Sequence, residues 1–393
     1  MAQTSFTPAQ VGFMHKALQL ARNGLGRVEP NPLVGCVIVR NGIIIATGYH
    51  RAFGGPHAEI EALKAAGTKA RGAELYVTLE PCCHTGKTGP CTQAIIAAGV
   101  RKVVAAMIDP FPAVAGRGIA ELKKAGLDAT HGLLAEQAAT LNAPFIKRVH
   151  RNLPYCIMKW AQSLDGCIAT RSGHSQWISC HESRQRVHEL RGRVDAIITG
   201  INTVLADDPL LTCRAQNTSA LKRIALRVVL DSSCRTPLNS KLIHTATTYP
   251  LLIAHKANLS GNAGRRAAAL RLAGAELLPL GSNALGRLRL DQLLKTLSKR
   301  GATNVLIEAG PTVMGSFLKH RGLIDSIEAY IAPCVLGDTQ AAHAIAGFAP
   351  RLFSQAIPFV WNQALRVGVD WLLTAQPQKQ AASSTEKQLA DHQ

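Results

Sequence analysis

The chain has 393 residues, of which 47% are hydrophobic and 5% aromatic, and its formal net charge is +19. This length suits two ordinary domains with full cores, and no apolar run approaches the roughly 20 residues of a membrane span. The basic residues are spread along the sequence and aromatic stacking platforms are scarce, so we expect neither a nucleic-acid partner nor a membrane one. The charge suits an ordinary basic surface or phosphorylated small molecules.

The N-terminal stretch "MAQTSFTPAQVGFMHKALQLARNG" shows no basic region followed by an apolar core, so we expect no export and a cytoplasmic protein. Thr7-Pro8 predicts a helix start, with an N-cap followed by proline. Strands are expected at "GCVIV", "LYVTL" and "KVVAAM", and helices at "HAEIEALKAAG", "CTQAIIAAG" and "GIAELKKAG". This alternation predicts a mostly parallel sheet with helices on its faces, in a first domain over 1–146.

The stretch 147–153 reads as a linker, and a second α/β domain is expected over 154–375. Its predicted strands are "YCIMKWA", "DAIIT", "RVVL", "LLIAH", "NVLIEA" and "IEAYIAPCVL". Helical patterns lie between them, at "ESRQRVHELRG", "RRAAALRLAG", "LDQLLKTLSKRG" and "TVMGSFLKHRG". The polar residues 376–393 are expected to form a disordered tail.

A candidate metal site lies in "TLEPCCHTGKTGPC", from Thr78 to Cys91. Ten cysteines are scattered along the chain, and only this cluster is organised, which favours metal ligands over disulfides in a chain without an export signal. A catalytic zinc ion takes three protein ligands, and the missing nitrogen is expected from His57 in "GGPHAEIEAL". His57 begins a helix, where Glu59 can also approach a site at the helix end.

The combination of H-x-E with P-C and a further cysteine is the signature of zinc deaminases. In such sites zinc makes hydroxide from a bound water near neutral pH, while the glutamate transfers protons without binding the metal. Neighbouring cysteines diverge, so Cys82 rather than Cys83 is expected to bind, together with Cys91 at a helix start, where the dipole favours thiolate. The predicted ligands are His57, Cys82 and Cys91, with Glu59 as the acid and base.

The motifs "PNPLVGCVIV", "GYH", "PHAE", "YVTLEPCCHTGKTGPC", "VAGRG", "SLDGCIA", "WIS", "TVLADDPLLTCR" and "EAGPT" occur in this order. Together they resemble the bifunctional riboflavin-biosynthesis deaminase/reductase family across nearly the whole chain. The resemblance implies a cytidine-deaminase-like zinc domain followed by a dihydrofolate-reductase-like, NADPH-dependent domain. It also implies two reactions, deamination of 2,5-diamino-6-(5-phosphoribosylamino)pyrimidin-4(3H)-one and then reduction of the ribosyl side chain of 5-amino-6-(5-phosphoribosylamino)uracil to ribityl.

The resemblance also implies site residues. In the deaminase half, Asn31 would contact the substrate base, and Lys87 and Thr88 would hold the ribose phosphate. The implied reductase substrate residues are Ser175, Arg191, Leu211, Arg214 and Glu308, with the two arginines as phosphate forks. The implied NADPH residues are Ala161, Trp177, Thr203, Asp207 and Ser232, together with Gly310, Pro311, Thr312, Val313, Met314, Gly315 and Ser316. The last seven follow a predicted strand and open a helix, an arrangement suited to phosphate, and Asp207 is also a candidate proton donor.

Three positions depart from the usual family pattern. Cys83 takes the place of a small polar residue, Gly89 stands where proline is common, and Phe111 in "DPFP" takes an asparagine position near the deaminase pocket. None of them removes a proposed ligand. Two other functions compete with this interpretation: a nucleoside or tRNA deaminase with an accessory basic domain, and a non-catalytic scaffold stabilised by zinc. We also expect a homo-oligomer.

Overall fold

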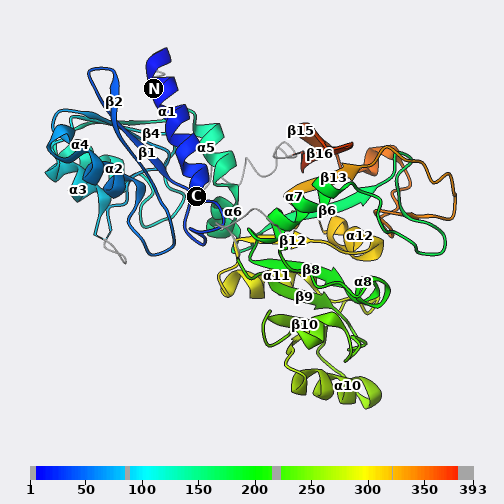
Figure 1. Ribbon diagram of the computed structural model, residues 1–393. Coiled ribbons are helices and arrows are strands. Elements are labelled where there is room, and N and C mark those ends of the chain that lie inside the picture. Colours follow the sequence, from blue (N-terminus) through cyan, green and yellow to red (C-terminus); the bar gives the residue numbers. More distant parts are fainter. Residues whose placement is uncertain (1–5, 85–88, 215–222, 321, 379–393) are drawn as a thin grey trace. The chain divides into compact units, whose positions relative to one another are not determined.

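Figure 1 shows the computed structural model, which describes residues 6–84, 89–214, 223–320 and 322–378. The described chain divides into two compact units. The first contains the residues up to Pro154 together with Lys295–Thr303, and the second contains Tyr155–Leu294 and the residues from Asn304 onward. Each unit is built around its own sheet.

The sheet of the first unit has five strands in the order β2-β1-β3-β4-β5. Their bounds are β1 Gly35–Arg40, β2 Ile43–Tyr49, β3 Glu74–Val77, β4 Lys102–Ala105 and β5 Asp128–His131. The pairs β3–β4 and β4–β5 are parallel, but β1 runs antiparallel to both β2 and β3. The sheet is therefore mixed, and the expectation of a mostly parallel sheet is wrong for this part.

The difference arises at a tight turn. Asn41 and Gly42 join β1 to β2, and both have positive φ, 50° and 74°. An Asn-Gly pair in this conformation forms a two-residue hairpin whose twist matches that of its strands. "RNGIII" thus contains a hairpin signal, and β2 was missed by the sequence analysis.

Helices cover both faces of this sheet, giving three layers. Alternate strand residues such as Cys36 and Leu75 pack against one set of helices, while Val37 and Tyr76 pack against Met14 and the rest of the other set. The first set is α2 Ala58–Ala66, α3 Cys91–Ala97 and α4 Arg117–Lys124, and the second includes α1 Pro8–Ala21 and α5 Ala135–Leu141. The expected helix start is confirmed, because Thr7 and Gln10 form a capping box at α1.

Helix α6, Ala143–Arg151, occupies most of the stretch for which the sequence predicts a linker. Its N-cap residue, Asn142, is buried and hydrogen bonds to the first unit: its Oδ1 accepts from the backbone N–H of Leu33 at 2.8 Å, and its Nδ2 donates to the Leu33 carbonyl at 3.0 Å. This helix is therefore part of the first unit's framework.

The sheet of the second unit has nine strands in the order β11-β10-β9-β8-β12-β6-β13-β16-β15. Their bounds are β6 Tyr155–Gln162, β8 Ala196–Gly200, β9 Leu226–Leu230, β10 Leu251–Lys256, β11 Glu276–Leu280, β12 Asn304–Ile307, β13 Ser326–Ile331, β15 Phe359–Val367 and β16 Asp370–Pro377. The pairs from β11 to β13 are parallel, so the carboxyl ends of these strands share one edge. A separate two-stranded sheet pairs β7 Cys167–Ala169 with β14 Ala342–His343.

The helices of this unit are α7 His181–Arg191, α8 Ile201–Asp207, α9 Lys241–His244, α10 Gly261–Leu272 and α12 Pro311–Lys319, together with the first half of α11 Leu290–Lys299, whose second half belongs to the first unit. The antiparallel β15–β16 hairpin was missed by the sequence analysis. Strand β16 continues through Gln376 and Pro377, where pairing with β15 orders two residues of the predicted tail; residues 379–393 lie outside the described part. Among the described helices, none is long and apolar enough to cross a bilayer.

Candidate functional sites

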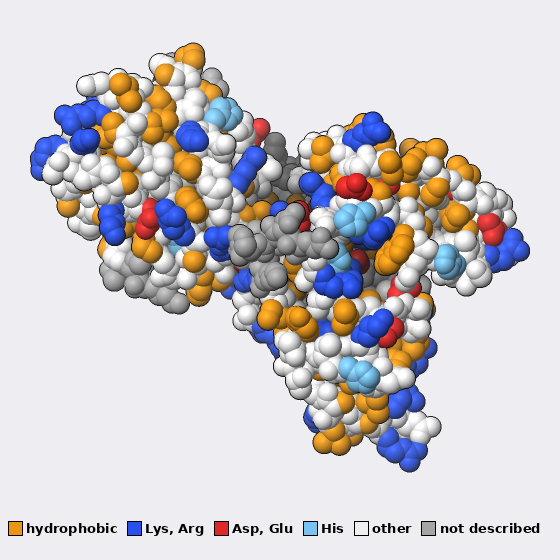
Figure 2. All heavy atoms as spheres, in the orientation of Figure 1, with side chains coloured by type: hydrophobic (Ala, Val, Ile, Leu, Met, Phe, Trp, Pro, Cys, Tyr) orange, Lys and Arg blue, Asp and Glu red, His pale blue; other side chains and the backbone are white. Residues whose placement is uncertain are grey.

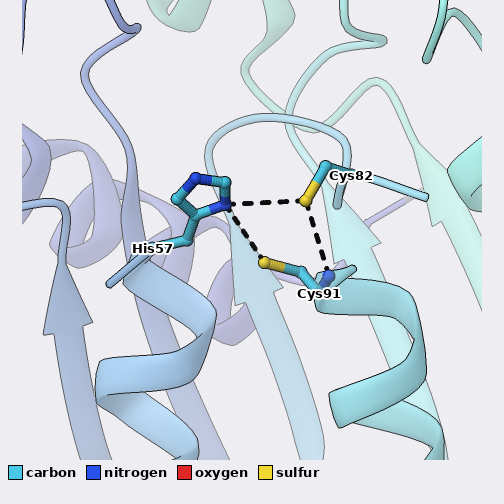
Figure 3. Close-up of side chains that lie close together, drawn as sticks. All are labelled: His57, Cys82 and Cys91. Carbon is cyan, nitrogen blue, oxygen red and sulfur yellow. Dashed lines mark hydrogen bonds between the residues drawn. The ribbon is translucent and has the colours of Figure 1, made fainter. Parts of the chain in front are cut away.

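Three side chains from separate elements of the first unit point toward one another (Figure 3). His57 is the N-cap residue of α2, Cys91 is the first residue of α3, and Cys82 lies in the segment after β3. His57 Nδ1 lies 3.3 Å from Cys91 Sγ and 3.5 Å from Cys82 Sγ, and the three atoms all lie within 4.8 Å of one another. These are the three residues predicted as metal ligands.

The spacing fits a tetrahedral metal ion. Ligands that sit about 2.0–2.3 Å from one zinc ion lie roughly 3.3–3.8 Å from each other, which brackets both nitrogen–sulfur distances. The hydrogen bond from Cys91, followed by that from His57, lowers the pKa of Cys82 to about 4, so its thiolate, the ligand form, is available. The same pairing raises the pKa of Cys91, which shares its proton with the neighbouring sulfur.

Close packing fixes the two elements that carry these ligands. A Cβ at Gly48 would lie 2.3 Å from the Ala58 carbonyl oxygen, so glycine lets the first turn of α2 pack on β2. A Cβ at Gly118 would lie 2.1 Å from the Pro81 carbonyl oxygen, so α4 packs directly against the segment that carries Cys82. Both glycines therefore position a predicted ligand.

The neighbouring Glu80 secures the same segment with hydrogen bonds. Its carboxylate accepts backbone N–H groups from Asp109 at 3.1 Å, Gly116 at 2.8 Å and Ile119 at 3.0 Å. The cysteine segment is thereby tied both to the loop after β4 and to the start of α4.

A cavity of about 400 Å³ opens beside the predicted ligands, and His57, Glu59 and Cys82 all line it. Glu59 is only 3% exposed, and its burial raises its pKa to about 7. A carboxyl group that gains and loses a proton near neutral pH suits proton transfer. The predicted acid–base residue thus shares a cavity with the predicted metal ligands.

Asn31 lines this cavity beside a residue to which the sequence analysis gave no role. Its side-chain Nδ2 lies 3.4 Å from His50 Nε2, and His50 Nδ1 lies 2.9 Å from the Pro56 carbonyl oxygen. Because a carbonyl only accepts, Nδ1 carries the proton and Nε2 accepts from Asn31. Burial lowers the pKa of His50, which favours this neutral form. His50 therefore orients Asn31, and the "GYH" motif was its signal.

The loop between the cysteines is described only in part. Lys87 and Thr88 lie outside the described residues, whereas His84 lines the cavity. Phe111 also lines it, with its ring centroid 6.2 Å from that of His84, and its backbone N–H donates to Asp109 at 2.8 Å. An aromatic wall therefore stands where the family pattern led us to expect a polar side chain.

In the second unit, the predicted substrate residues Arg191 and Glu308 form an ion pair. The Nε and Nη2 atoms of Arg191 lie 2.9 and 2.8 Å from the two carboxylate oxygens, and Lys159 Nζ lies 3.3 Å from one of them. Burial raises the pKa of Glu308, but the charges and hydrogen bonds of Arg191 and Lys159 outweigh it and hold the pKa well below its usual range. The guanidinium of Arg191 therefore binds a carboxylate of the protein itself. The sequence had led us to expect this guanidinium to bind a substrate phosphate.

His188 joins this ion pair to the segment that carries Leu211 and Arg214. Its Nδ1 lies 3.1 Å from the Thr212 carbonyl oxygen and 3.4 Å from the Arg214 backbone nitrogen. Leu211 is buried with a positive φ of 53°, and the Arg214 side chain is exposed. The structure therefore brings four of the five predicted substrate residues into one neighbourhood; no contact links Ser175 to them within the described residues.

A second cavity, of about 230 Å³, lies at the carboxyl ends of the parallel strands. Of the predicted cofactor residues, those that line it are Thr203, Ser232, Gly310, Pro311, Thr312, Val313 and Ser316. Thr203 Oγ1 accepts the Gly310 backbone N–H at 3.1 Å, which joins α8 to the start of α12. Arg235 and Arg287 line the same cavity and were missed by the sequence analysis.

Five predicted cofactor residues do not line this cavity. Met314 and Gly315 are buried, and a Cβ at Gly315 would lie 1.9 Å from the Ala346 carbonyl oxygen, so this glycine serves helix packing. Ala161 lies in β6 and Asp207 ends α8. Trp177 is 68% exposed, and the Arg184 guanidinium lies 4.7 Å from the centre of its ring.

Comparisons with known proteins first give the class of the two domains. Residues 9–107 match the family model for the cytidine and deoxycytidylate deaminase zinc-binding region, and residues 154–354 match the RibD C-terminal domain. Together with the two α/β units, these matches define a zinc-type deaminase domain joined to a reductase domain, which confirms the predicted fold class.

Whole-chain relatives then identify the family. Riboflavin biosynthesis protein RibD of Escherichia coli (strain K12) is 41% identical over 369 residues, covering 91% of this chain and 96% of that protein. RibD of Aquifex aeolicus (strain VF5) is 40% identical over 326 residues, covering 83% and 87%. The structure of Acinetobacter baumannii RibD, form 1, has a TM-score of 0.83 and 38% identity, covering 94% of this chain and 99% of that one.

The chain therefore belongs to the RibD family of riboflavin biosynthesis, and it is an enzyme with a deaminase and a reductase activity. This confirms the resemblance drawn from the sequence motifs.

Proposed function

We propose that the first unit deaminates 2,5-diamino-6-(5-phosphoribosylamino)pyrimidin-4(3H)-one with zinc held by His57, Cys82 and Cys91. The observation that carries this proposal is the convergence of these three ligand atoms beside the buried Glu59, in one cavity. A zinc ion held there supplies the positive charge that activates water. The overall change is replacement of the amino group at C2 by oxygen, with water consumed and ammonia released.

The proposed roles of the chain's own residues follow from their positions. Glu59 takes a proton from the attacking water and passes it to the departing amine, a transfer suited to a buried carboxyl group with a raised pKa. Asn31, oriented by His50, hydrogen bonds to the pyrimidine edge. Lys87 and Thr88 hold the phosphate, as the family resemblance implies.

For the second unit we propose NADPH-dependent reduction of the ribosyl side chain of 5-amino-6-(5-phosphoribosylamino)uracil to ribityl. The ring-opened sugar takes a hydride from the nicotinamide at C1′ and one proton, and Asp207 is our candidate donor. The phosphorylated substrate is held near Glu308, where Arg214, Leu211 and Ser175 contribute. The predicted cofactor residues that line the second cavity hold NADPH, together with Ala161 and Trp177.

Three features of the second cavity support the proposal that it binds NADPH. The N-terminus of α12 presents its dipole to a ligand phosphate. Arg235 and Arg287 line the cavity without a carboxylate partner in the described part of the chain. Lys256 lies at the end of β10, next to Gly286 on the cavity wall: a Cβ added at Gly286 would lie 3.0 Å from Lys256 Nζ. This positive surround suits a cofactor with three phosphate groups.

The test is incubation of the purified full-length protein with the diaminopyrimidine, with and without NADPH, followed by mass measurement of the products. We expect the deaminated uracil without NADPH and the ribityl product with it. An unchanged substrate mass in both reactions would refute the assignment.

Glu59→Gln separates catalysis from the alternative of a zinc-stabilised scaffold. We expect this variant to keep its zinc and its reductase activity and to lose deamination, because the amide cannot carry the proton. A scaffold would be indifferent to this substitution. The alternative of a nucleoside or tRNA deaminase predicts no saturable NADPH binding, which a titration of the full-length enzyme measures.

We also propose a cytoplasmic homo-oligomer that acts on phosphorylated pyrimidines and binds neither nucleic acid nor membranes. In the view of Figure 2, Lys and Arg side chains are interspersed with uncharged ones on both units rather than gathered in one band. The edge strand β15 exposes 51% of Val360 and 65% of Trp361, apolar surface suited to a second copy of the chain. Light scattering after size exclusion measures the oligomeric state.

A further inference from the structure

An arginine from helix α6 lines the deaminase cavity, far along the chain from the metal-site motifs. Phe145, Arg148 and Val149 all line the cavity that also holds His57 and Glu59. Positions three and four residues apart share one face of a helix, so this face of α6 forms a wall of the cavity. Arg148 is the cationic side chain on that wall.

The position of this helix is fixed relative to the base-binding segment. The N-cap residue Asn142 binds both the N–H and the carbonyl of Leu33, which lies two residues after Asn31. Further along α6, the Asn152 backbone N–H donates to the Arg148 carbonyl at 3.0 Å, so the backbone at Arg148 is regular helix. Arg148 and Asn31 therefore stand on one rigid framework within the first unit.

The guanidinium of Arg148 has no counter-charge within the described part of the chain. Its Nε is buried and has no hydrogen-bond partner among the described residues, and the side chain forms no ion pair with them. A donor removed from water without an acceptor is unfavourable, and more so when it is charged. Such a group in a cavity wall is stabilised when a ligand brings the missing acceptor.

The carboxylates that line the same cavity do not supply this acceptor. The Glu80 carboxylate already accepts hydrogen bonds from three backbone N–H groups, and the Asp109 carboxylate accepts one from the backbone N–H of Phe111. Glu59 sits beside His57 at the predicted metal ligands. The cavity thus presents a cation whose complement is an anionic ligand.

We propose that Arg148 binds the phosphate group of the deaminase substrate in addition to the two residues that the family resemblance implies, an inference that rests on the proposed function. A phosphate dianion offers several acceptor oxygens to the planar guanidinium fork, whereas the pyrimidine is neutral. The cavity volume lies within the range of sites that enclose a small ligand. In this arrangement the pyrimidine faces His57 and Glu59, and the phosphate lies against α6.

The experiment compares Arg148→Gln and Arg148→Lys with Arg151→Gln, which removes an exposed arginine from the same helix. Deamination is measured on the phosphorylated substrate and on its dephosphorylated ribosyl analogue. A lost charge-assisted contact of about 1.5–3 kcal/mol predicts a roughly 10- to 100-fold fall in kcat/KM for Arg148→Gln, mainly through KM, on the phosphorylated substrate alone. We expect a smaller fall for Arg148→Lys and no change for Arg151→Gln, with activity on the dephosphorylated analogue reporting that the deaminase unit of each variant folds.

Equal losses on the two substrates would overturn the proposal, because Arg148 would then act on the base or on the framework; unchanged kinetics would overturn it as well. Binding is scored separately by calorimetric titration of the phosphorylated pyrimidine into Glu59→Gln and into Glu59→Gln/Arg148→Gln. Weaker binding by the double variant supports Arg148 even if the wild-type enzyme releases no ammonia. Equal binding by the two refutes Arg148 while leaving the proposed function intact.

Discussion

In the deaminase unit the functional side chains are positioned mainly by backbone groups, whereas in the reductase unit they hold one another. Cys82 follows Glu80, whose carboxylate accepts from three backbone N–H groups, and Arg148 has no counter-charge among the residues that the structure describes. In the reductase unit, Glu308 is shared by Arg191 and Lys159 in an ion-paired cluster whose side chains are only 12–18% exposed. The first arrangement leaves charges available for a ligand, and the second satisfies them before any ligand arrives.

This difference predicts how substitutions act. Removing a ligand-binding group from the deaminase site takes away function and leaves the packing intact. Removing one member of the reductase cluster leaves an uncompensated buried charge, so stability falls together with activity. Variants of the two sites can therefore be compared within one polypeptide, because each activity reports on the folding of its own unit.

The largest expected effect is at the metal site. Cys82→Ser removes a thiolate ligand, so we expect loss of bound zinc and a fall in deamination of at least about 1,000-fold, with reductase activity retained. Cys83→Ser is the matched control, because Cys83 lies outside the ligand cluster. Metal content by mass spectrometry and ammonia release measure the two outcomes.

The alternative assignment would reverse this pattern. Zinc loss in Cys83→Ser with zinc kept in Cys82→Ser would show that the neighbouring sulfur is the ligand. Loss of reductase activity in either variant would show that the two units do not respond independently to substitution.

The next effect is on the reductase cluster. Glu308→Gln leaves Arg191 and Lys159 buried without a carboxylate, so we expect about 3–5 kcal/mol lower stability of this unit and loss of reduction. Asp291→Asn is the control, since it breaks the exposed pair with Arg289 and should cost less than about 1 kcal/mol. Denaturant unfolding followed by both activities measures the difference, and equal costs would contradict the buried-cluster explanation.

The sequence predicted the deaminase site better than the reductase site for a physical reason. His57, Cys82 and Cys91 lie within 35 positions, and their chemistry constrains both residue type and spacing. Arg191 and Glu308 were found by family resemblance, but their mutual ion pair joins the end of helix α7 to the end of strand β12, which only the fold brings together. Arg148 was invisible for the same reason, because no local pattern places α6 against the cavity.

The fold itself was predicted where apolar patterns were strong. The helices ending at Gly67 and Gly99 and most of the parallel strands were anticipated from local signals, whereas the parallel strands β5 and β11 were missed. The Asn41-Gly42 hairpin was overlooked despite its signal, and β15 was missed because most of its side chains are exposed. An edge strand with little buried surface carries a weak hydrophobic pattern.

A smaller effect is expected in how the stability of each unit depends on pH. The pKa of Glu308 is depressed, so its stabilising contribution is complete above the unfolded value near 4.5 and is lost as pH falls below it. Burial raises the pKa of Asp109 from 3.8 to about 6, so its contribution is present below 3.8 and is lost as pH rises toward 6. Each amounts to about 2–3 kcal/mol over two pH units.

The measurement is unfolding free energy between pH 3 and 7 for the wild type, Glu308→Gln and Asp109→Asn. We expect Glu308→Gln to flatten the acid limb and Asp109→Asn to flatten the fall between about pH 4 and 6. Parallel shifts of the whole curve, without a change of slope, would contradict both assignments.

The smallest effect tests which feature of the second cavity selects its cofactor. In dinucleotide-binding sheets, an acidic residue after a neighbouring strand binds the ribose 2′-hydroxyl of NAD, whereas arginine there accommodates the 2′-phosphate of NADP. After β9, Asp231 is buried and its Oδ2 accepts hydrogen bonds from Thr236, so Ser232 and Arg235 are the residues of this segment on the cavity wall.

Arg235→Gln should therefore raise KM for NADPH about 10-fold and leave KM for NADH unchanged. Arg265→Gln, which removes an exposed arginine of α10, is the control. A matching loss with both cofactors would place Arg235 on the shared pyrophosphate instead, because that group is common to both, and the 2′-phosphate would then be left to Arg287 and Lys256.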